Sequence, residues 1–203
     1  ASNTDLYMYY NSPWSANMQN PTAVWDDKYV GVWHLAETPN DNTVGGHRDS
    51  TSNHNDGTPM NFQDGGGGTT NTLGKIDGAD YFAGDDDYIT VPNPKNTDQA
   101  NQVTVSAWIR DDVYGEVVTR GDSYGLRMWG TGQLLFYKYM GGGSWFNLAP
   151  GAVNLKDGAF HYIVAGQNTT GMFMFIDGVQ RDGNTNTTPF VYGLGSTVEI
   201  GRH

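Results

Sequence analysis

The sequence contains no cysteine, so no disulfide can cross-link the fold and the redox compartment is not revealed. Long apolar runs are also missing. None approaches the length of a membrane-spanning helix, which argues against membrane insertion by this segment. The chain begins without the charged and apolar regions of a signal peptide, and we expect any signal or anchor to lie outside this sequence.

Basic residues are scarce, with 11 Lys and Arg against 22 Asp and Glu and a formal net charge of -11 at pH 7. Nucleic acids and anionic membrane surfaces are bound through Lys and Arg, so this balance argues against both as partners. Glutamate is nearly absent as well, because only Glu37, Glu116 and Glu199 accompany the 19 aspartates. Aspartate is typical of turns and of calcium loops, and we interpret most of the 19 as turn residues.

The sequence is rich in short segments of alternating polarity that are separated by Gly, Asn and Asp. No segment shows sustained helical periodicity, so the predicted fold class is all-β, with one domain and one core. The predicted strands are Leu6–Tyr10, Tyr29–Leu35, Ala79–Phe82, Tyr88–Val91, Val103–Arg110, Glu116–Thr119, Tyr124–Trp129, Gln133–Tyr139, Trp145–Leu148, Phe160–Gly166, Met172–Ile176 and Thr197–Ile200.

Two tight connections are predicted between neighbouring strands. Asp177 and Gly178 form a two-residue hairpin turn, in which Gly supplies the positive φ of a type I′ turn. A second hairpin turns at residues 130–132, and its simple register pairs Met128 with Leu134 and Leu126 with Phe136 on one face. The opposite face then carries the remaining side chains, which are those of Arg127, Trp129, Leu135, Tyr137 and Tyr139.

Several short motifs follow one another in a characteristic order: Val32–Leu35, Asp49–Thr58, Gly74–Ala79, Phe82–Pro92, Val103–Ile109, Asp157–Tyr162 and Phe175–Gly178. In this order they resemble the laminin-G-like, or concanavalin A-like, jelly-roll modules of bacterial or archaeal extracellular proteins. The resemblance covers residues 29–203 and implies an antiparallel jelly-roll sandwich of two sheets. Residues 1–28 are expected to form a lead-in segment with one strand that packs on the module.

Two positions depart from the family's pattern. Phe160 stands where the family usually carries tryptophan, and its large apolar ring should preserve the packing. After Ile200–Arg202 the family continues into a closing strand that this sequence does not contain. We expect that the strand has been trimmed away; the alternatives are that Leu6–Tyr10 or a partner chain takes its place.

The resemblance implies ligand and metal sites on the concave face of the curved sheet or on a loop rim. Calcium is the expected ion, because the candidate ligands are oxygens and neither cysteine nor paired histidine suggests zinc. The first candidate set is Asp49, Asn53 and Asn55, and Asp85 and Asp87 form a second. The alternative is an Asx-rich turn whose side chains bind their own backbone and need no metal.

A group of aromatic and cationic residues is the candidate ligand platform. Sugars present apolar C–H faces rimmed by hydroxyl groups, which suit aromatic rings beside hydrogen-bonding groups. The alternative is that these rings only pair across strands or cover a second apolar layer. Trp108 is assigned to packing as a family signature position. The predicted platform residues are Arg127, Trp129, Tyr137, Tyr139 and Trp145.

Catalysis is not expected from the sequence. The three glutamates are isolated, whereas a retaining glycosidase needs two carboxyl groups a few ångströms apart. His34 and His161 lie in predicted strands, and His47 and His54 lie in a polar loop, so all four are interpreted as structural or solvated.

The predicted function is therefore noncatalytic binding of a carbohydrate or another extracellular surface ligand. The chain would be a calcium-supported module of a larger secreted or cell-surface protein, beside neighbouring modules. Two alternatives stay open. One is a structural domain that packs against its neighbours and has no soluble ligand, and the other is a hydrolase whose catalytic residues are not recognised.

Overall fold

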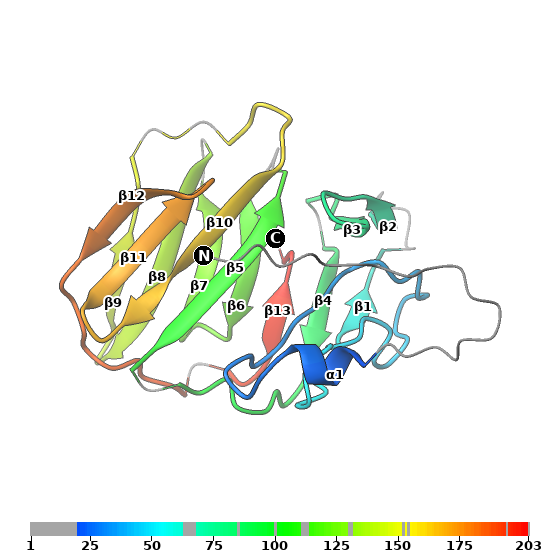
Figure 1. Ribbon diagram of the computed structural model, residues 1–203, viewed down its shortest axis with the longest axis horizontal. Coiled ribbons are helices and arrows are strands. Elements are labelled where there is room, and N and C mark those ends of the chain that lie inside the picture. The colour runs from blue at the N-terminus through cyan, green and yellow to red at the C-terminus, as the bar shows by residue number, and fades with distance from the viewer. Residues whose placement is uncertain are drawn as a thin grey trace, which may run out of the picture.

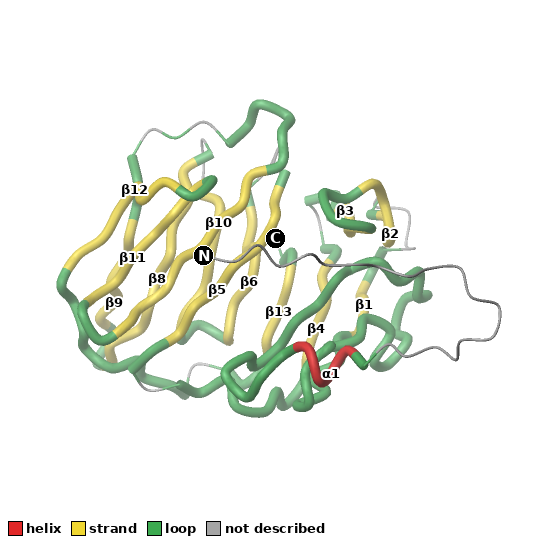
Figure 2. Tube along the Cα trace, in the orientation of Figure 1, coloured by secondary structure: helices red, strands yellow, loops and turns green. Residues whose placement is uncertain are grey.

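The computed structural model describes residues 20–62, 68–84, 86–99, 101–110, 114–129, 132–151, 153, 155–193 and 195–202. The predicted strand Leu6–Tyr10 lies outside these ranges. Within them the chain is nearly all β, with one short helix, α1 (Pro21–Val24), as Figure 2 shows.

Seven antiparallel strands form the larger sheet, in the order β1-β4-β13-β6-β7-β8-β9. In Figure 1 it lies behind a second sheet of four strands, in the order β12-β11-β10-β5. The seven strands are β1 (Thr58–Met60), β4 (Tyr88–Val91), β6 (Gly115–Arg120), β7 (Tyr124–Trp129), β8 (Gln133–Gly141), β9 (Ser144–Leu148) and β13 (Val198–Ile200). The four are β5 (Val103–Ile109), β10 (His161–Asn168), β11 (Gly171–Ile176) and β12 (Val179–Asn184).

The two sheets pack face to face and enclose the apolar core. Along β7 and β8 every second side chain points towards the four-stranded sheet. Strands β10 and β11 of that sheet contribute the core side chains that pack against them. The main core residues are Leu126, Met128, Leu134 and Phe136 from one sheet and Ile163, Ala165, Met174 and Ile176 from the other. The architecture is thus the predicted two-sheet antiparallel sandwich.

Both predicted hairpins are confirmed. Met128 pairs with Leu134 and Leu126 with Phe136 across β7 and β8, as the alternation requires. At the turn between β11 and β12, Asp177 and Gly178 adopt φ angles of 51° and 78°, which are the positive values of a type I′ turn.

The prediction of a strand at Tyr29–Leu35 is wrong. The Val32 amide donates to the Asp49 carboxylate at 2.9 Å, and Trp33 forms only an isolated bridge with Asp49. Leu35 has a φ of 55°, which no extended strand permits. Side-chain hydrogen bonding to Asp49 therefore replaces the strand ladder in this segment.

A further strand forms at residues 69–73, where the sequence predicted none. β2 (Thr69–Leu73) pairs with β3 (Gly78–Tyr81) in a small separate sheet. Figure 1 shows this hairpin beside the sandwich, above β1 and β4. Strand β1 was also missed, because its three residues contain a proline, which is a weak strand signal.

Lys138 is a cation buried inside the sandwich. Its ammonium group donates to the Gln167 side chain, to Asn186 Oδ1 at 3.0 Å and to the Thr188 carbonyl at 2.6 Å. Burial lowers the pKa of Lys138. Three oxygen acceptors satisfy the three donors of the ammonium group, so this lysine serves the fold and not the outer face of β8.

His161, at the start of β10, lies between two carboxylates. Its Nδ1 is 2.7 Å from Asp177 Oδ2, and its Nε2 is 3.1 Å from Asp157 Oδ1. The hydrogen bond with Asp177, aided by Asp157, raises the pKa of His161. The hydrogen bond with His161 lowers the pKa of Asp177, and the backbone amide of Ala159, together with His161, lowers the pKa of Asp157.

This cluster gives a pH dependence of known sign. A raised folded-state pKa means that the ion pairs of His161 stabilise the fold below the unfolded pKa, about 6.5, and that this contribution is lost as the pH rises through the folded pKa. We expect His161→Gln to reduce the free energy of unfolding more at about pH 5.5 than at about pH 9. Urea titrations of both proteins at the two pH values measure the difference; an effect that grows with pH would contradict the assignment.

Candidate ligand-binding face

The outer face of β7, β8 and β9 points away from the four-stranded sheet and carries the predicted platform. Arg127 and Trp129 alternate with the core residues of β7, and Tyr137 and Tyr139 do the same on β8. Trp145 of β9 pairs directly with Tyr139. The structure therefore brings all five predicted residues together on one face.

The side chains of this face form a continuous row of ring contacts. The guanidinium carbon of Arg127 lies 5.6 Å from the ring centroid of Trp129 and 5.1 Å from that of Tyr137. Trp145 continues the row, with its centroid 5.8 Å from Tyr137 and 4.9 Å from Tyr139. Trp129 and Trp145 are about half exposed, at 47% and 43%. The platform is therefore held by contacts among its own side chains and is accessible to solvent at both tryptophans.

Gly125 of β7 makes room for the central ring. A Cβ atom at this position would lie 2.6 Å from the hydroxyl oxygen of Tyr137, so only glycine lets the ring lie flat across the strand. The buried Tyr137 hydroxyl reaches Thr119 Oγ1 at 2.8 Å and Glu116 Oε2 at 3.4 Å. Burial, together with the charge of Glu116, raises the pKa of Tyr137, so the phenol stays protonated and neutral.

An ion pair on β6 and β7 anchors the cation of the platform. Arg127 donates from both Nε and a terminal nitrogen to Glu116 Oε1. Burial raises the pKa of Glu116 although Arg127 opposes this effect. For Arg127 burial acts downward, but the bond to Glu116 prevails and raises its pKa. The guanidinium is therefore held charged, with much of its charge balanced by one carboxylate.

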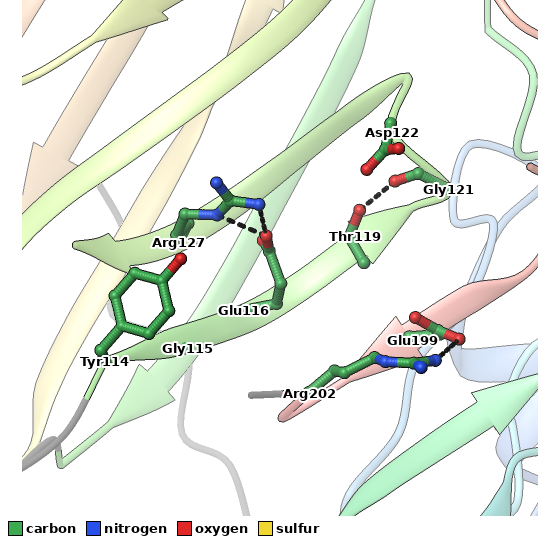
Figure 3. Close-up of a pocket in the computed structure, with 9 residues that line it drawn as sticks. All are labelled: Tyr114, Gly115, Glu116, Thr119, Gly121, Asp122, Arg127, Glu199 and Arg202. Carbon is green, nitrogen blue, oxygen red and sulfur yellow. Dashed lines mark hydrogen bonds and ion pairs between the residues drawn. The ribbon is translucent and has the colours of Figure 1, made fainter. Parts of the chain in front are cut away.

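A pocket of about 380 Å³ adjoins the platform (Figure 3). Tyr114 stands at one side of it and contacts the ring of Trp129 edge-on, at 5.4 Å between centroids. At the other side Arg202 donates to Glu199 Oε1 at 2.5 Å. The full lining is Tyr114, Gly115, Glu116, Thr119, Gly121, Asp122, Arg127, Glu199 and Arg202.

Sequence reasoning missed most of the pocket. Glu116 and Glu199 were predicted to be isolated, yet both line it. Strand β13 inserts between β4 and β6, and this places Glu199 opposite Thr119, which is 80 positions away in the chain. The residues around each strand do not indicate that two strands so far apart in the chain will pair. Only Tyr114, next to the predicted strand at Glu116, could have been proposed from its aromatic character.

The predicted calcium ligand Asp49 is buried and fully engaged by protein donors. Its Oδ1 accepts from the amides of Val32 and Thr51, both at 2.9 Å. Its Oδ2 accepts from Thr51 Oγ1 at 2.7 Å and from the Asn55 amide at 2.9 Å. Four donors occupy the four acceptor positions of a carboxylate, so Asp49 does not fit the role of a calcium ligand in this arrangement.

The companions of Asp49 are engaged in the same way. Asn55 Oδ1 accepts from the Lys95 amide at 2.7 Å, and Asn53 Oδ1 accepts from Asn96 at 2.7 Å. These contacts are compatible with the Asx-rich turn that was the alternative to a metal site. In the described part of the chain, no group of three or more His, Cys, Asp or Glu is arranged to hold a metal ion.

The second predicted metal pair lies between β3 and β4. Asp85 is outside the described residues. Asp87 is buried, and its Oδ2 accepts from the Ala83 amide at 2.7 Å. Its carboxylate also lies against Gly68, where a Cβ would come within 2.3 Å of it. Asp87 thus secures the turn before β4, and calcium binding at both loops stays a prediction.

Calcium removal distinguishes a loop that is stable without metal from the calcium site expected from the sequence. Because the chain itself satisfies the oxygens of Asp49 and Asn55, we expect the same Tm in calcium chloride and in EDTA, within about 1 °C. A ligand that binds only the folded state raises its stability, so a higher Tm in calcium would establish a calcium site and show that the loop rearranges. Differential scanning calorimetry provides the measurement.

The structure specifies the environment of two further residues. His47, which was interpreted as structural or solvated, has its side chain fully buried between two carboxylates, 3.3 Å from Glu37 Oε2 and 3.2 Å from Asp80 Oδ2. Burial raises the pKa of Asp80 to about 6. Trp108 was assigned to packing; it is 39% exposed on the outer face of β5 and stacks on Tyr162 at 5.1 Å.

The fold and this face together define a lectin-like β-sandwich. Residues 82–203 match the family model described as the concanavalin A-like lectin/glucanases superfamily, of the laminin G type. The match covers more than half of the chain, which therefore belongs to this family, as the motifs predicted. No match is found among curated proteins.

Solved structures share the fold at low sequence identity. Domain 4 of AbnA, an extracellular arabinanase of Geobacillus stearothermophilus solved with arabinotriose, has a TM-score of 0.56 at 18% identity, with 86% of this chain and 85% of that one covered. The binding domain of Paraclostridial Mosquitocidal Protein 1 has a TM-score of 0.55 at 11% identity, with 82% and 47% covered. The binding domain of botulinum neurotoxin serotype D also reaches 0.55, at 14% identity, with 84% and 43% covered. The chain thus spans less than half of the last two.

Proposed function

We propose that the chain is a noncatalytic carbohydrate-binding module of a larger secreted or cell-surface protein. The observation that carries this proposal is the row from Trp129 through Arg127 and Tyr137 to Trp145, which is held rigid by mutual contacts and open at both tryptophans. Exposed rings of this kind stack on the C–H faces of sugars, and the neighbouring polar groups bind their hydroxyls.

The similar solved structures support the proposal in general terms. One of them is a domain of an extracellular enzyme that holds arabinotriose, and two others are binding domains of longer proteins. Under the proposal, neighbouring modules of the parent protein are the protein partners. In the described ranges no helix is long and apolar enough to cross a membrane.

A glycan array tests the proposal. We expect the protein to bind at least one oligosaccharide and Trp129→Ala to lose that binding. Trp108→Ala is the matched control, because its ring is similarly exposed but lies on the other sheet. Retained binding by a folded Trp129→Ala variant, or no binding to any glycan, would refute the proposal. The second result would favour a structural module.

Hydrolysis is the alternative that one observation favours, because Glu116 and Glu199 line the same pocket. A glycosidase needs one carboxyl group as an acid and a second as nucleophile or base. Although burial raises the pKa of Glu116, one carboxylate oxygen of each glutamate already accepts from an arginine, Arg127 or Arg202, and is therefore not available to a substrate. Chromatography of the bound oligosaccharide after long incubation should therefore show no cleavage, whereas cleavage lost in Glu116→Gln would establish an enzyme.

A further inference from the structure

The side chains that line the pocket carry more negative than positive formal charge. Among the described residues that line it are three carboxylates, those of Glu116, Asp122 and Glu199, and two guanidinium groups, those of Arg127 and Arg202. The formal sum is one negative charge. The whole chain adds to this field with a formal net charge of -11.

Neither guanidinium presents an uncompensated charge to a ligand. Arg127 directs Nε and one terminal nitrogen to Glu116, which is the geometry that would otherwise bind a sulfate or carboxylate of a ligand. Arg202 donates to Glu199 and places its guanidinium carbon 4.6 Å from the ring centroid of Tyr88. Both cations are thus bound by the protein's own acids.

Among the described residues that line the pocket, no arginine is paired with the third acid. Asp122 is exposed at the turn between β6 and β7, and its charge acts on the pocket, where it contributes to the raised pKa of Glu116. An anionic sugar on the platform would be repelled by this carboxylate, and the two cations in the described lining of the pocket are already paired with Glu116 and Glu199. A neutral sugar pays no such cost and uses the carboxylates as hydrogen-bond acceptors for its hydroxyls.

We propose that this face selects uncharged oligosaccharides and that Glu116, Asp122 and Glu199 reject glycans that carry carboxylate or sulfate groups. The inference rests on the proposed function and adds the charge class of the ligand. Stacking on Trp129 and Trp145 attracts the sugar, and the negative charge of the three acids disfavours anionic glycans relative to neutral ones.

Matched pairs of glycans on one array provide the test: lactose with 3′-sialyllactose, trigalacturonate with its methyl ester, and arabinotriose as a further neutral probe. We expect binding to neutral members at an affinity that changes less than about twofold between low and high salt, because screening acts only on charge. Each anionic member should bind at least about tenfold more weakly than its neutral partner.

Charge-removing variants locate the discrimination. At low salt, Asp122→Asn and Glu116→Gln should each reduce the ratio of the affinity for the neutral member to that for the anionic member by at least about threefold; this ratio is called the affinity gap. Asp27→Asn removes the same charge from an exposed site beside α1 and should leave the affinity gap unchanged. Asp122 is exposed, so its substitution avoids the folding risk of the partly buried Glu116.

The outcomes separate this inference from the function on which it rests. Equal or tighter binding of anionic members that still needs Trp129 would overturn the inference and leave carbohydrate binding intact. An unchanged affinity gap in folded Asp122→Asn and Glu116→Gln would also overturn it. Binding that does not need Trp129, or no binding to any member, would overturn the proposed function and the inference with it.

Discussion

Replacing Asp49 with asparagine is expected to lower the free energy of unfolding by about 3 to 5 kcal/mol. Asp49 is 4% exposed, and its carboxylate accepts four hydrogen bonds, two of which come from the backbone amides of Val32 and Asn55. Asparagine has the same shape but turns an NH₂ group towards two donors. Each buried donor left unpaired costs about 1 to 3 kcal/mol, and the loss of charge weakens the remaining bonds.

Urea unfolding followed by tryptophan fluorescence measures this effect, once in EDTA and once in calcium chloride. Ser52→Ala is the matched control, because Ser52 is exposed in the same loop and should change stability by no more than about 0.5 kcal/mol. An Asp49→Asn variant as stable as the original protein in EDTA would contradict the structural role. A loss of stability seen only with calcium would instead make Asp49 a metal ligand.

Replacing Trp129 and Trp145 together with alanine is expected to weaken oligosaccharide binding by more than about tenfold, or at least about 1.4 kcal/mol. Both rings are about half exposed and pack laterally on Arg127 and Tyr137 rather than into the core. Their removal should therefore reduce contact area with the ligand while the sandwich stays folded. Isothermal titration calorimetry gives the affinity, and near-ultraviolet circular dichroism checks the fold.

The double variant has an informative control in Trp108→Ala. Trp108 stacks on Tyr162 on the outer face of the four-stranded sheet, so its loss should leave the affinity within about twofold of the original. If Trp108→Ala abolished binding and the double variant did not, the ligand would lie on the four-stranded sheet, and the assignment of the face would be wrong.

The sequence predicts local features of this protein well because they follow from local rules. The alternation of β7 and β8, together with a short turn between them, determines both the register and the face on which Arg127, Trp129 and Tyr137 lie. Trp145 on β9 follows by the same pairing. Most of the platform is thus contained in one meander of adjacent strands.

Features that depend on distant segments could not be predicted. Glu199 joins the pocket only because β13 inserts beside β6, and alternation gives no information on such insertions. The strand predicted at Tyr29–Leu35 failed for a related reason, since Asp49 takes the Val32 amide that a ladder would use. The burial of His47 could not be predicted either, because its partners Glu37 and Asp80 lie on other segments.

Stacking of sugars on Trp129 and Trp145 can be observed through the indole N–H signals of the protein. The chain contains six tryptophans, so a ¹⁵N-labelled sample should give six resolvable indole signals in a two-dimensional NMR spectrum. Titration with an oligosaccharide that binds on the array should shift the signals of Trp129 and Trp145 and leave those of Trp33 and Trp108 unchanged. Saturable shifts at Trp108, with Trp129 and Trp145 unaffected, would contradict the account.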